Sequence, residues 1–176
     1  MCKIPGVKKV AVLALSLLLV SCGYGFVRYS GGLGDVRSVA IDTPRNDAYE
    51  AGVEFIVADA LRREFLRRRV PKLVADPDGA DLVISGRVLP IRARSRSFSS
   101  VVQALEYELT LDVELLARRS DGTIVPIDGR ATRESERYLA SADSEALRKN
   151  REEAIRQAAN VLAGRVYDSL AETLTP

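Results

Sequence analysis

Apolar and polar residues alternate regularly along residues 105–115. Acidic residues or threonine occupy the positions in between, and the apolar positions are Leu105, Tyr107, Leu109, Leu111, Val113 and Leu115. A period of two sends successive side chains to opposite faces of a strand. The pattern therefore predicts a long strand that anchors the core of a sheet with one buried and one solvated face.

Residues 52–69 and 143–174 show the period of an α-helix instead. The apolar stripe of the first segment consists of Val53, Ile56, Val57, Ala60, Leu61 and Phe65. The stripe of the second segment consists of Ile155, Ala158, Ala159, Leu162, Val166 and Leu170. Spacings of three and four residues place each set on one face, so both helices are expected to face the core. Asp143 can cap the second helix.

Two large apolar residues of the first helix, Phe55 and Leu66, fall outside its stripe. They lie among charged residues on the opposite side of the helix. Two interpretations remain open: they pack on the second helix, or they contact a partner protein.

Shorter apolar segments at 36–41 and 73–75 predict further strands. Residues 80–96 form a longer one whose apolar positions change parity at Pro90, which indicates a bulge because proline cannot donate to a ladder. A hairpin-type turn at Asp121-Gly122 leads into a returning strand over residues 123–138. This order of elements predicts an α+β fold, with two helices packed on one face of a mostly antiparallel or mixed sheet of four to five strands.

The first 21 residues have the pattern of a secretory signal peptide. Three lysines precede an apolar run over residues 10–20, which is too short to span a bilayer. The run ends in Leu-Val-Ser-Cys, which resembles the bacterial lipobox, so Cys22 is expected to be lipidated and to become the first residue. The residue after the cysteine is Gly23, whereas a signal for retention in the inner membrane resembles an aspartate at this position. Gly23 therefore indicates that the protein is sent to the outer membrane. The alternative is an ordinary signal peptide that happens to end beside a cysteine.

The remaining residues are expected to form a tether and one domain. Residues 22–34 hold the lipidated Cys22 and many glycines, typical of a flexible tether, and residues 35–176 have the length of a single domain. Three of the 26 basic residues and none of the 24 acidic ones lie in the signal peptide, so its removal changes the net charge from +2 to −1. That charge gives no reason to expect a nucleic-acid partner. The chain has no histidine, and we expect no catalytic residues, no metal and no cofactor.

Arginines are the most notable candidate chemistry. Arg92, Arg94 and Arg96 alternate along one predicted strand, and Arg130 and Arg133 lie in the returning strand. Guanidinium groups bind phosphate through two parallel hydrogen bonds, so these arginines form a candidate site for a phosphorylated lipid head group such as that of lipopolysaccharide. The other interpretation is a solvated, salt-bridged sheet edge that deters edge pairing. The acidic residues of the 105–115 strand are expected to form a solvated face.

Several segments together resemble the LptE family, lipoproteins of lipopolysaccharide assembly. The similar segments are CGYGF at 22–26, SVAI at 38–41 followed by Asn46, YEAGVE at 49–54, ALRREF at 60–65 and ADLVISG at 80–86. The resemblance covers most of the chain after the signal peptide, and it implies an α+β domain that sits inside the LptD β-barrel and helps deliver lipopolysaccharide. The family has no catalytic signature, so the resemblance assigns no residue a role.

The sequence as a whole therefore predicts a non-enzymatic outer-membrane lipoprotein on the periplasmic side. It would act as a plug and scaffold for an LptD-like β-barrel, with lipopolysaccharide as a possible ligand and the membrane as its anchor through Cys22. The alternative is a free-standing, periplasm-facing lipoprotein that binds an envelope ligand or polymer.

Overall fold

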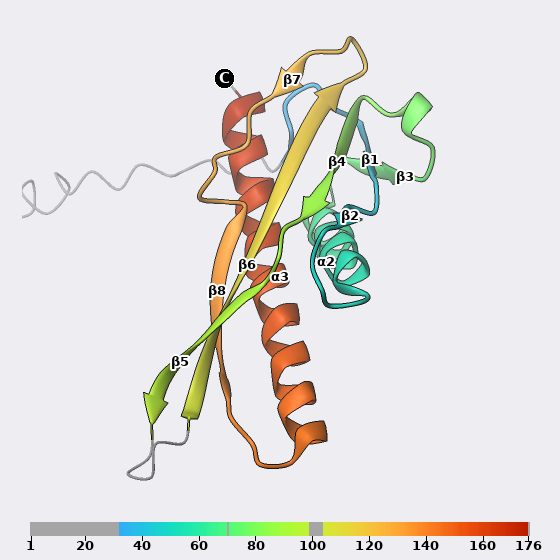
Figure 1. Cartoon of the computed structure of the whole chain (residues 1–176). Helices are drawn as coiled ribbons and strands as arrows, with labels where there is room; N and C mark the ends of the chain where they lie inside the picture. The colour runs from blue at the N-terminus through green and yellow to red at the C-terminus, as the bar shows by residue number, and fades with distance from the viewer. Residues whose placement is uncertain (1–31, 70, 99–103, 176) are drawn as a thin grey trace, which may run out of the picture. The chain divides into compact units, whose positions relative to one another are not determined.

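The computed structural model describes residues 32–69, 71–98 and 104–175 (Figure 1). The predicted signal peptide, Cys22 and most of the predicted tether lie outside these residues. The last tether residues are described, and Leu33 among them is fully buried and forms a bridge with Val36.

One long strand, β6 (Ala104–Arg119), organises the sheet. Four strands pair with it, all antiparallel: β4 (Leu82–Val88), β5 (Arg92–Phe98), β7 (Ile124–Val125) and β8 (Arg133–Leu139). Three further strands pair in parallel: β1 (Ser38–Ile41), β2 (Arg45–Asn46) and β3 (Lys72–Val74). β1 and β2 pair with β4, and β3 pairs with β1. The main strand order is β3-β1-β4-β6-β5.

The described residues thus form an α+β fold with a mixed sheet of eight strands, which confirms the predicted class. The sheet has more strands than the four to five predicted. Two predicted strands are each divided in the structure, near Pro90 and between Pro126 and Gly129, and the two-residue β2 has no visible sequence pattern. Proline removes a backbone donor, so a ladder that reaches one tends to be interrupted.

The predicted bulge at Pro90 is confirmed by the register. Val88 pairs with Val113, and Arg92 pairs with Thr110. Three residues of the β4–β5 side therefore oppose two residues of β6. The extra residue shifts the parity: the buried positions of β4 are even-numbered, and Ile91, which packs against the core after Pro90, is odd-numbered. Ala93, the next odd-numbered apolar position, is exposed.

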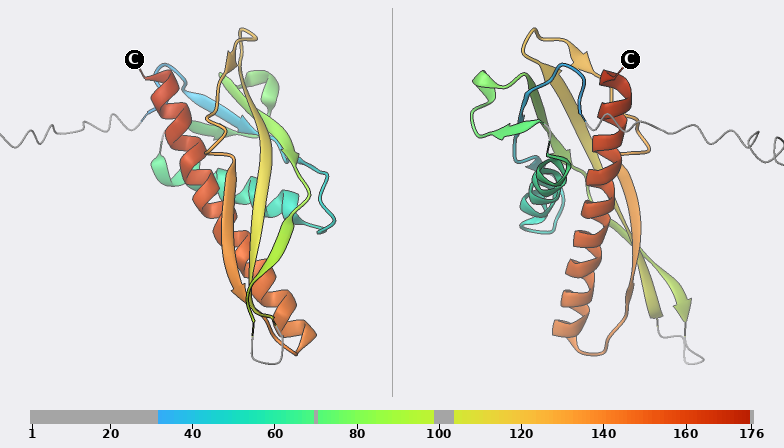
Figure 2. Two further views of the ribbon diagram at one scale, coloured as in Figure 1. Left: turned by 60° about the vertical axis from the view of Figure 1, so that its left-hand side comes forward. Right: turned by 180° about the vertical axis from the view of Figure 1, so that it is seen from behind.

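Both helices lie on the same face of the sheet (Figures 1 and 2). They are α2 (Val53–Arg68) and α3 (Ser144–Leu174), and a 3₁₀ turn, η1 (Pro77–Gly79), precedes β4. Every residue of the stripe predicted for α3 is buried, and so is that of α2 except for Ile56, which is partly buried. Neither helix in the described part of the chain is at once long and apolar enough to cross a membrane.

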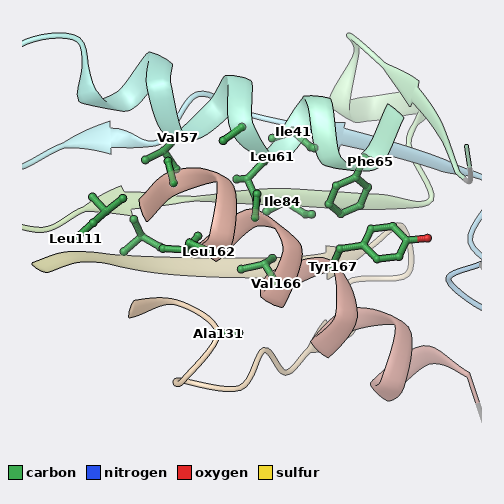
Figure 3. Packing of buried hydrophobic residues seen from close by; sticks show 14 of the residues in the cluster. Ile41, Val57, Leu61, Phe65, Ile84, Leu111, Ala131, Leu162, Val166 and Tyr167 are labelled. Carbon is green, nitrogen blue, oxygen red and sulfur yellow. The ribbon is translucent and has the colours of Figure 1, made fainter. Parts of the chain in front are cut away.

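The core lies between the helices and the central strands (Figure 3). Phe65 of α2 meets Tyr167 of α3 edge to face, with 5.0 Å between the ring centroids. Leu109 and Leu111 are fully buried from the sheet side, as predicted. Leu105 is 51% exposed, so the prediction of a buried Leu105 is wrong. In the right-hand view of Figure 2 the start of β6 diverges from α3.

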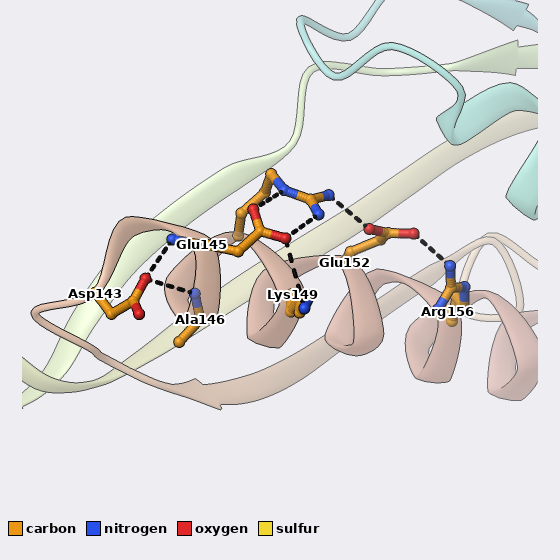
Figure 4. Close-up of polar contacts among 7 residues, drawn as sticks. Asp143, Glu145, Ala146, Lys149, Glu152 and Arg156 are labelled. Atoms are coloured by element: carbon orange, nitrogen blue, oxygen red, sulfur yellow. Dashed lines mark hydrogen bonds and ion pairs between the residues drawn. The ribbon is translucent and has the colours of Figure 1, made fainter.

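Asp143 caps α3 as predicted (Figure 4). Its Oδ1 accepts hydrogen bonds from the backbone N–H groups of Glu145 and Ala146, at 2.8 and 3.2 Å. A ladder of ion pairs then follows the exposed side of the helix, from Glu145 through Arg148 and Glu152 to Arg156. Such pairs at spacings of three and four residues stabilise a helical turn that packing alone does not cover.

Candidate functional site

The polar face of the sheet turns away from both helices and is built from β5, β6 and β8. On β6 the residues between the buried leucines point to this side. Cross-strand pairing then aligns three rows of polar side chains. Arg94, Glu108 and Arg137 form one row; Arg92, Thr110 and Ser135 form the next; Asp112 and Arg133 form the third. We call these three rows the arginine face.

Four guanidinium groups of the arginine face share two carboxylates. Asp112 lies between Arg92 and Arg133, at N–O distances of 3.7 and 2.5 Å. Glu108 lies between Arg94 and Arg96, at 3.1 and 3.5 Å. We include Arg96 in the arginine face on the strength of this pair. The positive charge of these groups therefore exceeds the negative charge that neutralises it.

The carboxylates are sheltered and the guanidinium groups are not. The side chains of Asp112 and Glu108 are only 12% and 14% exposed, whereas those of Arg92 and Arg94 are each 73% exposed. The acids lie on the central strand and the arginines on its flanks. This arrangement holds the guanidinium groups in place from below and leaves their outer donors available to a ligand.

A hollow of about 570 Å³ opens on this face. Its lining consists of Arg92, Ala93, Arg94, Glu108, Thr110, Arg133 and Ser135. The hydroxyl groups of Thr110 and Ser135 lie 2.9 Å apart at its floor and form a hydrogen bond. A site lined by three arginines and two hydroxyl groups offers donors to a multivalent anion such as a phosphate ester.

The structure brings together part of the arginine set singled out from the sequence. Arg92, Arg94 and Arg133 line the hollow, and Arg96 joins them through Glu108. Arg130 lies apart, in the turn before β8, where its backbone N–H donates to Asp128 at 2.9 Å. The structure thus separates Arg130 from the other arginines because the chain turns between it and β8.

Sequence reasoning missed the role of Asp112 and Glu108. We expected a solvated acidic face, yet these two side chains lie beneath the arginines that they bind. The usable signal was the matching alternation of acidic residues at 106–114 and arginines at 92–96, because antiparallel pairing sets such stripes side by side.

A second surface lies on the outer side of α2. Phe55 and Leu66 are each 63% exposed, so the interpretation that they pack on α3 is wrong. α3 contacts α2 on the other side, through Phe65, and turns Phe55 and Leu66 outward. Tyr49, just before the helix, is 97% exposed. We call Tyr49, Phe55 and Leu66 the α2 apolar surface.

A second hollow, of about 490 Å³, lies between the start of α2 and α3. Its apolar floor includes Val53, Ile56 and Ile155, and an ion pair between Arg151 and Glu50 lies at its rim. Burial opposes the charge on Arg151, but its interactions with Glu50 and with Tyr138 together outweigh burial and hold the pKa of Arg151 above its usual range.

Three comparisons with known proteins bear on this chain. The model of the LptE family, described as lipopolysaccharide-assembly, matches residues 36–170. No match is found among curated protein sequences.

Several solved structures share the fold. Rare lipoprotein B from Shewanella oneidensis has 17% identity and a TM-score of 0.51, over 75% of this chain and 96% of that one. An uncharacterized lipoprotein B from Nitrosomonas europaea has 13% identity and a TM-score of 0.55, over 85% and 90%. A hypothetical protein from Chlamydia trachomatis has 8% identity and a TM-score of 0.51, over 76% and 96%. At these identities the likeness concerns the fold alone.

Proposed function

Since the chain belongs to the LptE family of lipopolysaccharide assembly, we propose that it is a non-enzymatic lipoprotein that binds lipopolysaccharide and docks in an LptD-like barrel of the outer membrane. Cys22 would anchor it on the periplasmic side. The observation that carries the lipopolysaccharide part is the arginine face, where four guanidinium groups share two carboxylates.

The chemistry of the arginine face suits a phosphorylated lipid head group. A phosphate can accept two parallel hydrogen bonds from one guanidinium group, and each charge-assisted bond is worth about 1.5–3 kcal/mol. Arg92, Arg94 and Arg133 surround one hollow, so a single phosphate group can reach more than one of them. The buried carboxylates limit the entropy lost on binding because they already restrain these side chains.

A triple substitution tests the ligand. Changing Arg92, Arg94 and Arg133 to alanine should weaken the binding of purified lipopolysaccharide by at least about tenfold, the equivalent of one lost contact of about 1.4 kcal/mol. Lysine at the same positions should restore binding only in part, because lysine lacks the planar fork.

The matched control changes Arg37, Arg69 and Arg130 to alanine, which removes the same charge from exposed positions outside the hollow. It should leave the affinity near that of the native chain. Equal losses in both triple variants would mean that net charge alone attracts the lipid, and an unchanged affinity in the first would exclude this site.

The α2 apolar surface supports the barrel partner. Phe55 and Leu66 are large exposed apolar residues on one side of α2, with the charged Asp59 and Arg62 between them, and aromatic and aliphatic side chains of this kind are candidates for contact with a partner. Photo-crosslinkers at Phe55 and Leu66 should capture a large outer-membrane β-barrel protein from intact cells, while a crosslinker at the exposed Asp78 of η1 serves as the control. Capture of lipid alone at all three positions would favour the free-standing, periplasm-facing lipoprotein that binds an envelope ligand or polymer.

A further inference from the structure

The outer edge of β5 is an unpaired strand edge of seven residues, of which Arg92–Ser95 pair regularly with β6 before the register shifts after Ser95. Among the described residues, β5 pairs with β6 and with no other strand, and the main strand order ends there. Figure 1 shows β5 running out at the rim of the sheet, with the long β6 between it and β8. Alternate backbone N–H and C=O groups of such a strand point outward without a partner, which makes it a template for a further strand.

Other edges of the sheet are less suited to this role. β3 at the opposite end has only three residues, Lys72–Val74. β8 packs against α3, and Arg165 of that helix forms an ion pair with Glu134 of β8 at 2.5 Å. β5 therefore offers an accessible, regularly paired segment, Arg92–Ser95, that is longer than β3.

The side chains of β5 define what can pair with it. Arg92 and Arg94 project on one side at alternate positions of the regularly paired part of β5, and Arg96 lies at the register shift that follows Ser95. The three arginines share the carboxylates of Glu108 and Asp112 with Arg133. A strand added at the outer edge would carry its own side chains next to these arginines, about 4.7–4.9 Å across from β5. Acidic residues at alternate positions would meet the guanidinium groups of Arg92 and Arg94 in register.

A second copy of this chain is a poor occupant of the edge. Two β5 strands paired edge to edge would place arginines opposite arginines, and like charges directly across a ladder are destabilising. The same stripe that repels a copy attracts a strand of opposite charge.

We propose that β5 binds an extended acidic segment of a partner protein by strand addition. The segment presents Glu or Asp at every second residue to Arg92 and Arg94, and its backbone pairs with the outer edge of β5 at Arg92–Ser95. This inference goes beyond lipopolysaccharide binding and does not depend on it, because the backbone edge, rather than the hollow, forms the contact.

The test uses the full-length chain in detergent and the synthetic peptide acetyl-Thr-Glu-Val-Glu-Thr-Glu-Val-amide. Hydrogen–deuterium exchange is measured for β5 and for α3 as an internal reference. At a peptide concentration about ten times its dissociation constant, exchange of the outward amides of β5 should slow about tenfold, and α3 should not change. Raising the salt should weaken the effect, because these side chains are exposed to solvent.

Two matched peptides separate the parts of the inference. A version with methylated backbone nitrogens keeps the carboxylates but cannot pair, and it should give no protection; protection by it would overturn strand addition. A version with Gln for Glu keeps the backbone, and it should bind at least about tenfold more weakly. Equal binding of that version would overturn the acidic partner.

Two further outcomes would reject the proposal of strand addition by an acidic segment. If exchange of β5 slows with protein concentration in the absence of peptide, a second copy occupies the edge and the proposal is wrong. Absence of any protection by the acidic peptide likewise rejects it. None of these results depends on lipopolysaccharide, so a failure here leaves the ligand test of the arginine hollow intact.

Discussion

Leu109 lies at the centre of β6 and its side chain is completely buried. Leu109→Ala should lower the free energy of unfolding by about 2–5 kcal/mol, since the cavity left behind adds to the lost transfer free energy. Leu105 belongs to the same strand and the same face but is half exposed, so Leu105→Ala should cost less than about 1 kcal/mol. Urea denaturation of both variants measures the contrast. Similar losses would show that the start of β6 is covered.

Gly86 of β4 lies against the backbone of β6. A Cβ atom at this position would approach the carbonyl oxygen of Glu114 to 2.0 Å, and only backbone movement can relieve that contact. Gly86→Ala should therefore destabilise the fold by about 1–3 kcal/mol or more. Gly79 in η1 has open space around its Cα, so Gly79→Ala should stay within about 0.5 kcal/mol of the native chain. Thermal melts distinguish the two, and equal melting temperatures would contradict the close approach.

Some residue environments could be predicted from the sequence and others could not. The period of two identified Leu109 and Leu111 as core residues because it records which face of a strand is apolar. The same pattern gave no information on how far the helix cover extends, and Leu105 lies beyond it. Burial of Asp112 depends on arginines from two other strands, so it follows only from comparing the alternation at 92–96 with that at 106–114, and not from the pattern of β6 alone.

At the scale of elements, Asp81 ties β1 to β4. Its carboxylate accepts hydrogen bonds from the backbone N–H groups of Arg37 and Ser38, both at 2.9 Å, and its own N–H donates to the hydroxyl of Ser38. The backbone bond from Arg37 makes the largest contribution, and with the hydrogen bonds from Ser38 to the carboxylate it holds the pKa of Asp81 below its usual 3.8.

This shift fixes a pH dependence. Because the folded state has the lower pKa, the ionised Asp81 stabilises the fold above the unfolded value and loses that contribution as the pH falls through the folded value. Asp81→Asn should be less stable than the native chain at neutral pH, and the gap should narrow below about pH 4. Urea midpoints at pH 7, 5 and 3 provide the measurement. A gap that stays constant with pH would mean that the carboxylate charge does not matter.

The elements themselves were more predictable than their pairing. Both helices and the interruption at Pro90 follow from periodicity and from the chemistry of proline. The exposure of Phe55 and Leu66 did not follow, because it depends on which side of α2 meets α3. The convergence of the β5 and β8 arginines in one hollow did not follow either, because it depends on both strands pairing with β6.

At the scale of the whole molecule, membrane attachment remains a prediction from the sequence. Cys22→Ser should leave the fold unchanged and release the protein from the membrane, or leave the signal peptide uncut. Membrane fractionation after a salt wash, with the size of the chain followed by mass spectrometry, is the measurement. A fully processed variant that still partitions with the outer membrane would exclude the lipid anchor.

The position of β6 in the chain has a consequence for the speed of folding. Residues 32–98 can pair only the short parallel strands β1, β2, β3 and β4 among themselves, and β5 has no partner until β6 exists. β6 must then pair with strands from both earlier and later parts of the chain, as when Leu82 of β4 pairs with Arg119 of β6. Contacts between residues this distant in sequence require the entropy of loop closure to be lost before the contact stabilises the fold. The chain should therefore fold slowly for its size. Until β6 is in place, β4 and β5 are exposed to mispairing and to capture by chaperones.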